Sequence, residues 1–224
     1  DLYGTEFTIG YDTALNNVVD AIRKLRDTIE SHRRAIILEV MGNTSGWLAL
    51  TSAIAGGAAA VAIPEVEETW DQDELIRRLI AGVRRDYRYF IIVVAEGVLK
   101  RAGADWSQRL AKRIETAAPI QEILGHAMEA RINSVGHVAR GGSPSALDNT
   151  LAGLLGSAAA DVAQLGALSH GGAIEGDVMV GTRGTRVIVT PLDEVIANSP
   201  RLVERESDLF QLSNKLMLSA GQAF

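Results

Sequence analysis

The chain has 224 residues, a length that is enough for one large α/β domain or two smaller lobes. Of these residues 47% are hydrophobic and 22% are charged. Its 28 acidic and 22 basic residues give a net charge of −6 without a basic stripe, so we expect no nucleic-acid partner. The absence of cysteine excludes disulfides, thiolate nucleophiles and cysteine-ligated zinc, and it fits a cytoplasmic location. The start of the chain lacks the pattern of a signal peptide, and the apolar stretch 47–63 is broken by glycine, so we expect no membrane span.

Apolar periodicity in the first half of the chain alternates between helix and strand. Leucine, valine and isoleucine recur at helical spacing up to Ile29, and either Asp12 or Thr13 can cap this first helix. Short continuous apolar runs that end at glycine, proline or glutamate are typical of buried strands. The predicted helices are 12–29, 47–55, a helix around 75–83, and 106–116, and the predicted strands are 35–41, 59–63 and 90–95.

This alternation predicts an α/β fold with three layers, in which a mostly parallel sheet is covered by helices on both faces. Ligands of such folds bind outside the carboxyl ends of the strands. The segments of interest are therefore 42–46, Glu96 with Gly97, and Gly136 with His137.

The second half of the chain is less regular. A long helix rich in alanine and leucine is predicted over 143–165, with Ser145 or Asp148 near its start. The stretch 170–193 contains two short β-like segments, at 178–180 and 186–190, and the tail from Ser207 is predicted to be helical.

Three segments could carry chemistry. The glycine-framed loop 41–46 could receive an anion on its backbone N–H groups, although a plain turn has the same composition. Segment 136–145 brings His137 and Arg140 together before a glycine pair, which suits a phosphate as well as a flexible helix entry. Glu96 could accept hydrogen bonds from sugar hydroxyls, or it could be an exposed residue at the end of a strand.

Seven segments together resemble phosphofructokinase, in that family's order and approximate spacing. They are 8–15, 31–32, 39–42, 55–58, 63–65, 94–97 and 136–145. The resemblance implies a phosphofructokinase-like fold whose N-terminal, donor-binding part lies upstream of Asp1 and is absent from this sequence. It divides the chain into a remnant of the catalytic acidic loop, a fructose 6-phosphate-binding domain, a segment returning to the donor domain and a tail, at 1–10, 11–138, 139–195 and 196–224.

The resemblance also implies roles for individual residues. The residues expected to contact fructose 6-phosphate from their own subunit are Met41, Gly42, Asn43, Glu96, His137 and Arg140. Arg34 and Arg131 match arginines that reach the sugar phosphate from a neighbouring subunit, which implies a homo-oligomer, a dimer or a tetramer. Asp1 matches the second aspartate of the catalytic loop, which lies near the Mg²⁺-bound phosphates.

Two positions depart from the family pattern. Asn43 stands where the family has an arginine that steadies the transferring phosphoryl group. Losing such a donor commonly costs about 10²–10³ in rate. Arg26 matches an arginine of the allosteric effector site, whereas Ala59 stands where many bacterial members carry an effector-site glutamate.

The function implied is the glycolytic transfer of a phosphoryl group from ATP to the 1-hydroxyl of fructose 6-phosphate, with Asp1 and Asn43 in the catalytic region. A diphosphate-dependent enzyme and a non-catalytic regulatory subunit that binds sugar phosphate remain the alternatives. The chain alone is expected to be incomplete as a kinase, because phosphoryl transfer requires both substrates to be positioned.

Overall fold

The computed structural model describes residues 1–29, 33–168 and 173–219. Ser31 and His32 of the family resemblance, and His170, lie outside these ranges. The chain divides into two compact units. We call Asp1–Ala14 with Gly142–Arg201 the hairpin unit, and Leu15–Gly141 with Leu202–Phe224 the sheet unit. The functional domain boundaries expected from the sequence stay a prediction.

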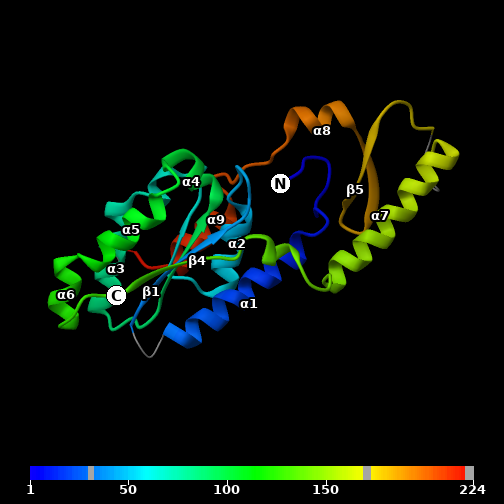
Figure 1. The fold of residues 1–224 in the computed structure, drawn as a ribbon. Coiled ribbons are helices and arrows are strands. Elements are labelled where there is room, and N and C mark those ends of the chain that lie inside the picture. Colours follow the sequence, from blue (N-terminus) through cyan, green and yellow to red (C-terminus); the bar gives the residue numbers. More distant parts are fainter. Residues whose placement is uncertain (30–32, 169–172, 220–224) are drawn as a thin grey trace. The chain divides into compact units, whose positions relative to one another are not determined.

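The sheet unit is built around a four-stranded parallel sheet with the order β2-β3-β1-β4 (Figure 1). Its strands are β1 (Ala35–Val40), β2 (Ala60–Ala62), β3 (Phe90–Ala95) and β4 (Ala130–Ser134). The central strands β1 and β3 consist almost entirely of apolar residues, and every residue of β3 is buried. Such continuous apolar strands require cover on both faces of a sheet, so the predicted α/β class is confirmed.

One face of the sheet packs against α3 (Gln72–Arg84), α5 (Trp106–Glu115) and α6 (Ala118–Leu124). Leu79 and Leu110 lie there against Ile37 and Phe90, and all four side chains are fully buried. This core holds the carboxyl ends of the strands in a fixed position.

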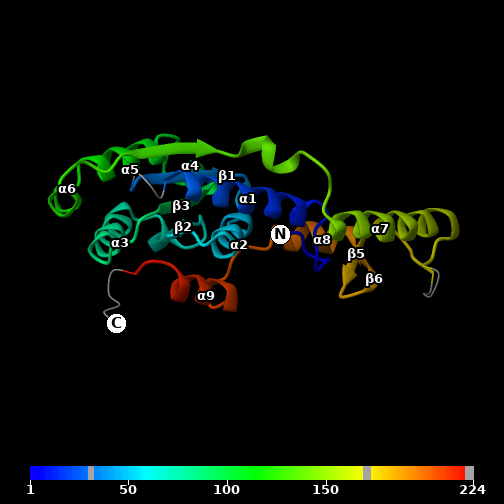
Figure 2. The same cartoon turned by 90° about the horizontal axis from the view of Figure 1, so that it is seen from below.

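The helix α2 (Trp47–Gly56) packs on β3 outside that core and also contacts α9 (Asp208–Leu216), as Figure 2 shows. The helix α1 (Tyr11–Ile29), which begins in the hairpin unit, meets α2 where Ile22 lies against Gly56. A Cβ atom at Gly56 would lie 2.8 Å from the Ile22 side chain, so only glycine permits this close approach.

The hairpin unit contains the antiparallel strands β5 (Val178–Arg183) and β6 (Arg186–Pro191), beside α7 (Ala146–Leu165) and α8 (Leu192–Asn198) (Figures 1 and 2). The N-terminal segment lies along β5, because the Glu6 amide donates to the Thr182 carbonyl at 2.7 Å. The two predicted β-like segments are confirmed and are longer than expected.

The start of α7 shows why the predicted helix 143–165 is too long. Ser145 is its N-cap, and the Ser145 hydroxyl accepts a hydrogen bond from the Asp148 amide at 3.2 Å. The helix therefore begins at Ala146, as expected for a serine cap.

The prediction that Asp12 or Thr13 caps α1 is wrong, because both lie inside the helix, which begins at Tyr11. The Asp148 carboxylate of α7 serves this end instead, accepting from the Gly10 and Thr13 amides at 2.8 and 2.7 Å and from the Thr13 hydroxyl. Burial opposes ionisation of Asp148, but the hydrogen bonds from Thr13 and Gly10 outweigh it and lower the Asp148 pKa.

Several short elements were not predicted. They are α4 (Glu96–Ala102), α6, α8 and β4, together with the 3₁₀ helices η2 (Glu67–Thr69) and η3 (Gly136–Arg140). Across the described ranges, no helix combines the length and the apolar character needed to cross a membrane.

Candidate functional site at the carboxyl edge of the sheet

Three predicted segments lie at one edge of the sheet. The register pairs Val40 with Ala95, and Glu39 with Ser134, so β1, β3 and β4 end at the same level. The loop 41–46 therefore follows the central strand β1, with Glu96 after one neighbouring strand and η3 after the other. The expectation that these segments share an edge is confirmed.

Glu96 anchors the loop 41–46. One oxygen of its carboxylate accepts from the Gly42 amide at 3.4 Å and closely from the Asn43 amide. The next residue, Gly97, allows α4 to approach, because a Cβ atom there would lie 2.7 Å from Pro64 and 3.0 Å from the Asn43 carbonyl oxygen. Glu96 is thus the first residue of a helix that packs tightly on the loop, rather than an exposed strand end.

Lys100 also lies at the loop, and sequence reasoning missed it. Its ammonium donates to Asn43 Oδ1 at 2.6 Å and lies 3.6 Å from Glu96 Oε1. Glu96 and Lys100 form an i,i+4 pair on α4. The spacing of the pair was the available signal, but it has meaning only on a helix, and α4 was not predicted.

A second carboxylate holds the other end of the loop. Glu65 Oε1 accepts from the Gly46 amide at 2.8 Å and from the Val203 amide at 3.1 Å. Glu65 thereby joins the end of β2, the start of α2 and the segment before α9, while its Oε2 is buried without a hydrogen-bond partner. Two acidic side chains therefore fix the loop at both of its glycines.

His137 and Arg140 lie on η3, and both are exposed. Their backbone is anchored by Asn17 of α1, whose amide donates to the Ala139 and Gly141 carbonyl oxygens at 3.0 Å. The imidazole and the guanidinium are therefore accessible at the edge that carries the loop 41–46.

Arg34 and Arg131 lie at the opposite edge. Arg34 precedes β1, and Arg131 is the second residue of β4. Both form ion pairs with Glu129. The six residues of β1 separate this edge from the loop, by about 20 Å at the usual rise of a strand.

Asp1 belongs to the hairpin unit, where its carbonyl oxygen accepts a hydrogen bond from the Arg201 amide. Its side chain is exposed. Within the described part of the chain, no group of three histidine, aspartate or glutamate side chains could enclose a metal ion. Magnesium commonly uses one or two protein carboxylates together with substrate phosphates, so Asp1 fits a shared ligand and not a complete site.

Arg26 stacks on an aromatic cluster. Its guanidinium lies 5.6 Å from the centre of the Tyr89 ring, and the Tyr87 and Tyr89 rings are 4.8 Å apart. Burial, followed by a hydrogen bond with Tyr89, raises the Tyr87 pKa above its ordinary value. Ala59 is fully buried, so it offers no side chain to a ligand.

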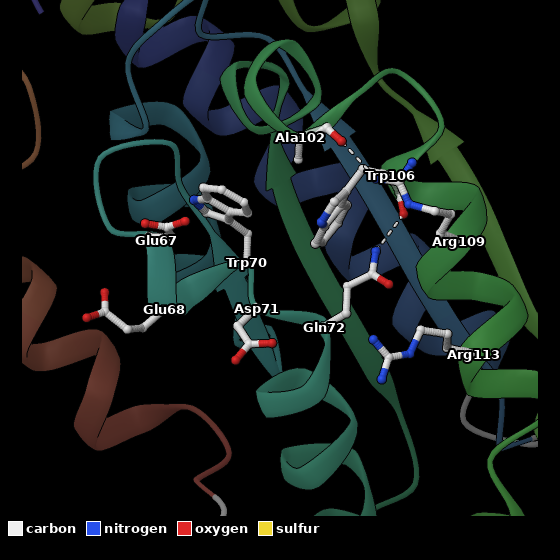
Figure 3. Close-up of a pocket in the computed structure, with 9 residues that line it drawn as sticks. All are labelled: Glu67, Glu68, Trp70, Asp71, Gln72, Ala102, Trp106, Arg109 and Arg113. Carbon is white, nitrogen blue, oxygen red and sulfur yellow. Dashed lines mark hydrogen bonds between the residues drawn. The ribbon is translucent and has the colours of Figure 1, made fainter.

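A separate cavity of about 680 Å³ lies between η2 and α5 (Figure 3). Figure 3 shows Trp70 and Trp106 across from each other, with Gln72 donating to the Trp106 carbonyl oxygen at 3.0 Å. Its arginines have internal partners: Arg109 pairs with Asp105, and Arg113 with Asp73. None of the predicted site residues lines this cavity.

The carboxyl edge is therefore the better candidate site. It combines donors for an anion, namely the Asn43 side-chain amide, the Lys100 ammonium and the exposed His137 and Arg140, with the carboxylate of Glu96 as an acceptor for hydroxyl groups. A ligand with both a phosphate and hydroxyl groups matches this set.

Comparison with known proteins identifies the family of the chain. The family model for phosphofructokinase matches residues 1–163. ATP-dependent 6-phosphofructokinases of Brevibacillus brevis and Bacillus subtilis are 39% and 37% identical over 218 residues, which is 97% of this chain and 60% of each relative. A Listeria welshimeri enzyme of the same name is 39% identical over 93% of this chain and 58% of its own length. The chain thus spans about 60% of the length of these relatives.

Solved structures agree. Phosphofructokinase from Saccharomyces cerevisiae is 30% identical with a TM-score of 0.68, over 97% of this chain and 27% of that chain. A pyrophosphate-dependent phosphofructokinase from Marinobacter aquaeolei shares the fold at 22% identity, with a TM-score of 0.68 over 100% of this chain and 58% of that one. The phosphofructokinase family model matches most of this chain, so the chain belongs to the phosphofructokinase family.

Proposed function

We propose that this chain is the fructose 6-phosphate-binding part of an ATP-dependent 6-phosphofructokinase of glycolysis. The observation that carries the proposal is the convergence of the loop 41–46, Glu96 and η3 on one edge of the sheet in a member of this family. The related bacterial enzymes named above are ATP-dependent, which supports ATP as the donor.

In this proposal the sugar phosphate binds at the carboxyl edge. Glu96 accepts hydrogen bonds from sugar hydroxyls, and Met41 and Gly42 form the floor beneath the sugar. His137 and Arg140 donate to the phosphate, for which an arginine provides a bidentate contact. The binding orients the 1-hydroxyl toward the donor, and such positioning supplies much of the catalysis in phosphoryl transfer.

Arg34 and Arg131 would act on the site of a neighbouring subunit. Their position at the amino edge, together on Glu129, supports this role, because they cannot reach the loop of their own sheet unit without crossing the length of β1. The proposal therefore includes a homo-oligomer, a dimer or a tetramer, and a cytoplasmic location.

Asp1 would be the carboxylate of this chain that faces Mg²⁺ on the donor phosphates. The bound ion would neutralise the charge of those phosphates. Asn43 would face the transferring group as a neutral donor, where the family resemblance leads one to expect arginine.

Asn43 also favours a second function, a non-catalytic subunit that binds sugar phosphate and regulates an active homologue. A neutral amide stabilises a transferring phosphoryl group less than a guanidinium does. Asn43→Arg in an otherwise complete enzyme separates the two functions, because a large gain in turnover indicates an impaired catalyst, whereas no gain indicates the binding role.

The test of the proposal is an assay of fructose 6-phosphate phosphorylation with Mg²⁺, offering ATP and diphosphate in parallel. The intact mass of the purified protein is also measured, and the protein is titrated with the sugar phosphate. Turnover with ATP supports the proposal, and turnover with diphosphate alone changes the donor. Binding without turnover, from protein of this mass, leaves sugar-phosphate binding as the supported function of this chain. The absence of both contradicts a fructose 6-phosphate function.

A further inference from the structure

The charges at the loop 41–46 are unevenly placed. Glu96 puts a negative carboxylate directly on the Gly42 and Asn43 amides, which are the backbone donors that an anionic ligand would otherwise use. An anion approaching this loop would be repelled by that carboxylate, because like charges a few ångströms apart interact strongly even near a protein surface. A site for phosphate here needs a compensating cation.

Lys100 is placed to provide it. Its ammonium lies 3.6 Å from Glu96 Oε1 and contacts Asn43 at both the side-chain and the carbonyl oxygen, at 2.6 and 3.4 Å. The Lys100 side chain is 53% exposed, so a ligand can reach it. A lysine ammonium has three N–H donors, and the two hydrogen bonds to Asn43 use two of them.

Lys100 also fixes the orientation of Asn43. A lysine can only donate, so its partner on the Asn43 side chain must be the carbonyl oxygen. The Asn43 amide nitrogen, a neutral donor, is then left on the other side of the group. The Asn43 backbone has φ 55°, a left-handed conformation that asparagine tolerates better than most residues.

We propose that Lys100 is the residue that makes this loop selective for anions. It neutralises Glu96, so that a sugar phosphate can bind at this edge, and it donates, together with the Asn43 side-chain amide, to the transferring phosphoryl group that Asn43 faces in the proposed function. The inference rests on the proposed function for the identity of the ligand, a sugar phosphate. The cation that serves the loop 41–46 then comes from α4, outside the sequence of the loop itself.

The test uses isothermal titration of the full chain with fructose 6-phosphate. Lys100→Gln should weaken binding about tenfold or more, because it leaves the Glu96 carboxylate uncompensated near the anionic ligand, and it should reduce the dependence of binding on salt. Lys100→Arg should retain most of the affinity. The double variant Asn43→Arg with Lys100→Gln should recover it, because the charge is moved to the neighbouring side chain.

Lys24→Gln is the matched control. Lys24 forms the same kind of i,i+4 pair, with Asp20 on α1, and its removal changes the net charge equally. This variant should bind as the unchanged protein does. Rescue by the double variant shows that binding requires a cation beside Glu96, whereas a packing role of the Lys100 side chain itself would leave the double variant as weak as Lys100→Gln.

The outcomes distinguish this inference from the proposed function. Normal binding by Lys100→Gln would overturn the inference and leave the sugar-phosphate function standing. A weakened Lys100→Gln that the double variant fails to rescue would also overturn it. If fructose 6-phosphate does not bind but inorganic phosphate binds in a Lys100-dependent manner, the proposed function fails and the inference holds. If neither ligand binds, both fail.

Discussion

The two units of this chain bury their apolar residues very differently. In the sheet unit, every residue of β3 is buried, and α3, α5 and α6 close a continuous core against it. In the hairpin unit, three residues of each strand are only half-buried, and the 20-residue α7 buries only Asp148, Leu151 and Ala158. The difference indicates that the sheet unit carries most of the stability and supplies a rigid base for the carboxyl edge.

The largest expected effect tests that core directly. Leu110→Ala removes a fully buried side chain of the sheet unit and should lower the free energy of unfolding by about 2–5 kcal/mol. Leu154→Ala on α7, where the side chain is 37% exposed, should cost less than about 1 kcal/mol. Urea denaturation measures both, and an equal loss in the two variants would contradict the comparison.

Asp148 anchors the start of α1 within the hairpin unit. Asp148→Asn places an amide where two backbone N–H groups and a hydroxyl need an acceptor, and it should cost about 1–3 kcal/mol. Because the folded pKa is lowered, this stabilisation is present above the unfolded pKa of about 3.9 and is lost as the pH falls through the folded value.

The measurement for Asp148 is the free energy of unfolding as a function of pH. The Asp148→Asn variant should lose part of the acid dependence seen in the unchanged protein. Asp177→Asn, at an exposed position of the same unit, should leave that dependence nearly intact. Identical pH profiles for all three proteins would show that Asp148 is not the anchor described.

Gly97 tests the fit of α4 on the loop. Gly97→Ala adds a Cβ atom 2.7 Å from Pro64, so we expect a loss of about 1–3 kcal/mol from overpacking and a weaker hold on the loop. Gly153→Ala is the control, since α7 leaves open space there, and it should be neutral or stabilising by up to about 1 kcal/mol. Thermal melts compare the two, and a neutral Gly97→Ala would mean that α4 does not depend on this close approach.

The smallest effect is expected at the Arg26 cluster. Arg26→Gln removes a cation from the Tyr89 ring and should cost about 0.5–1 kcal/mol, as for exposed cation–π contacts. Tyr89→Leu in the same background should then add no further cation–π loss, which a double-mutant cycle on the free energy of unfolding measures. Additive effects of the two changes would contradict the contact.

The sequence predicted the apolar strands and the longer amphipathic helices of the sheet unit well, and its short elements poorly. The strands around Ile37 and Ile92 are continuous apolar runs, and such runs have few alternatives. The strand β4 (Ala130–Ser134) escaped notice because its sequence, Ala-Arg-Ile-Asn-Ser, is that of a partly exposed edge strand. The helix α4 escaped because it begins at Glu96-Gly97, and glycine is a poor helix former.

The candidate site was predicted in part for the same reason. Its glycines, Glu96 and His137 could be located because they follow strands, and ligands gather at strand ends. The contacts of Lys100 with Asn43 and of Glu65 with Gly46 could not be predicted, because each joins residues that are distant in the sequence. Such contacts depend on tertiary packing, which local patterns do not encode.

The most direct test of the central claim is an NMR titration of the chain with fructose 6-phosphate. Trp47 follows the loop 41–46, whereas Trp70 and Trp106 line the separate cavity, so the indole signals report on the two places independently. We predict shifts at the Gly42 and Asn43 amides and at the Trp47 indole, with Trp70 and Trp106 unchanged. Shifts confined to Trp70 and Trp106 would place the ligand in the other cavity and contradict the assignment of the carboxyl edge.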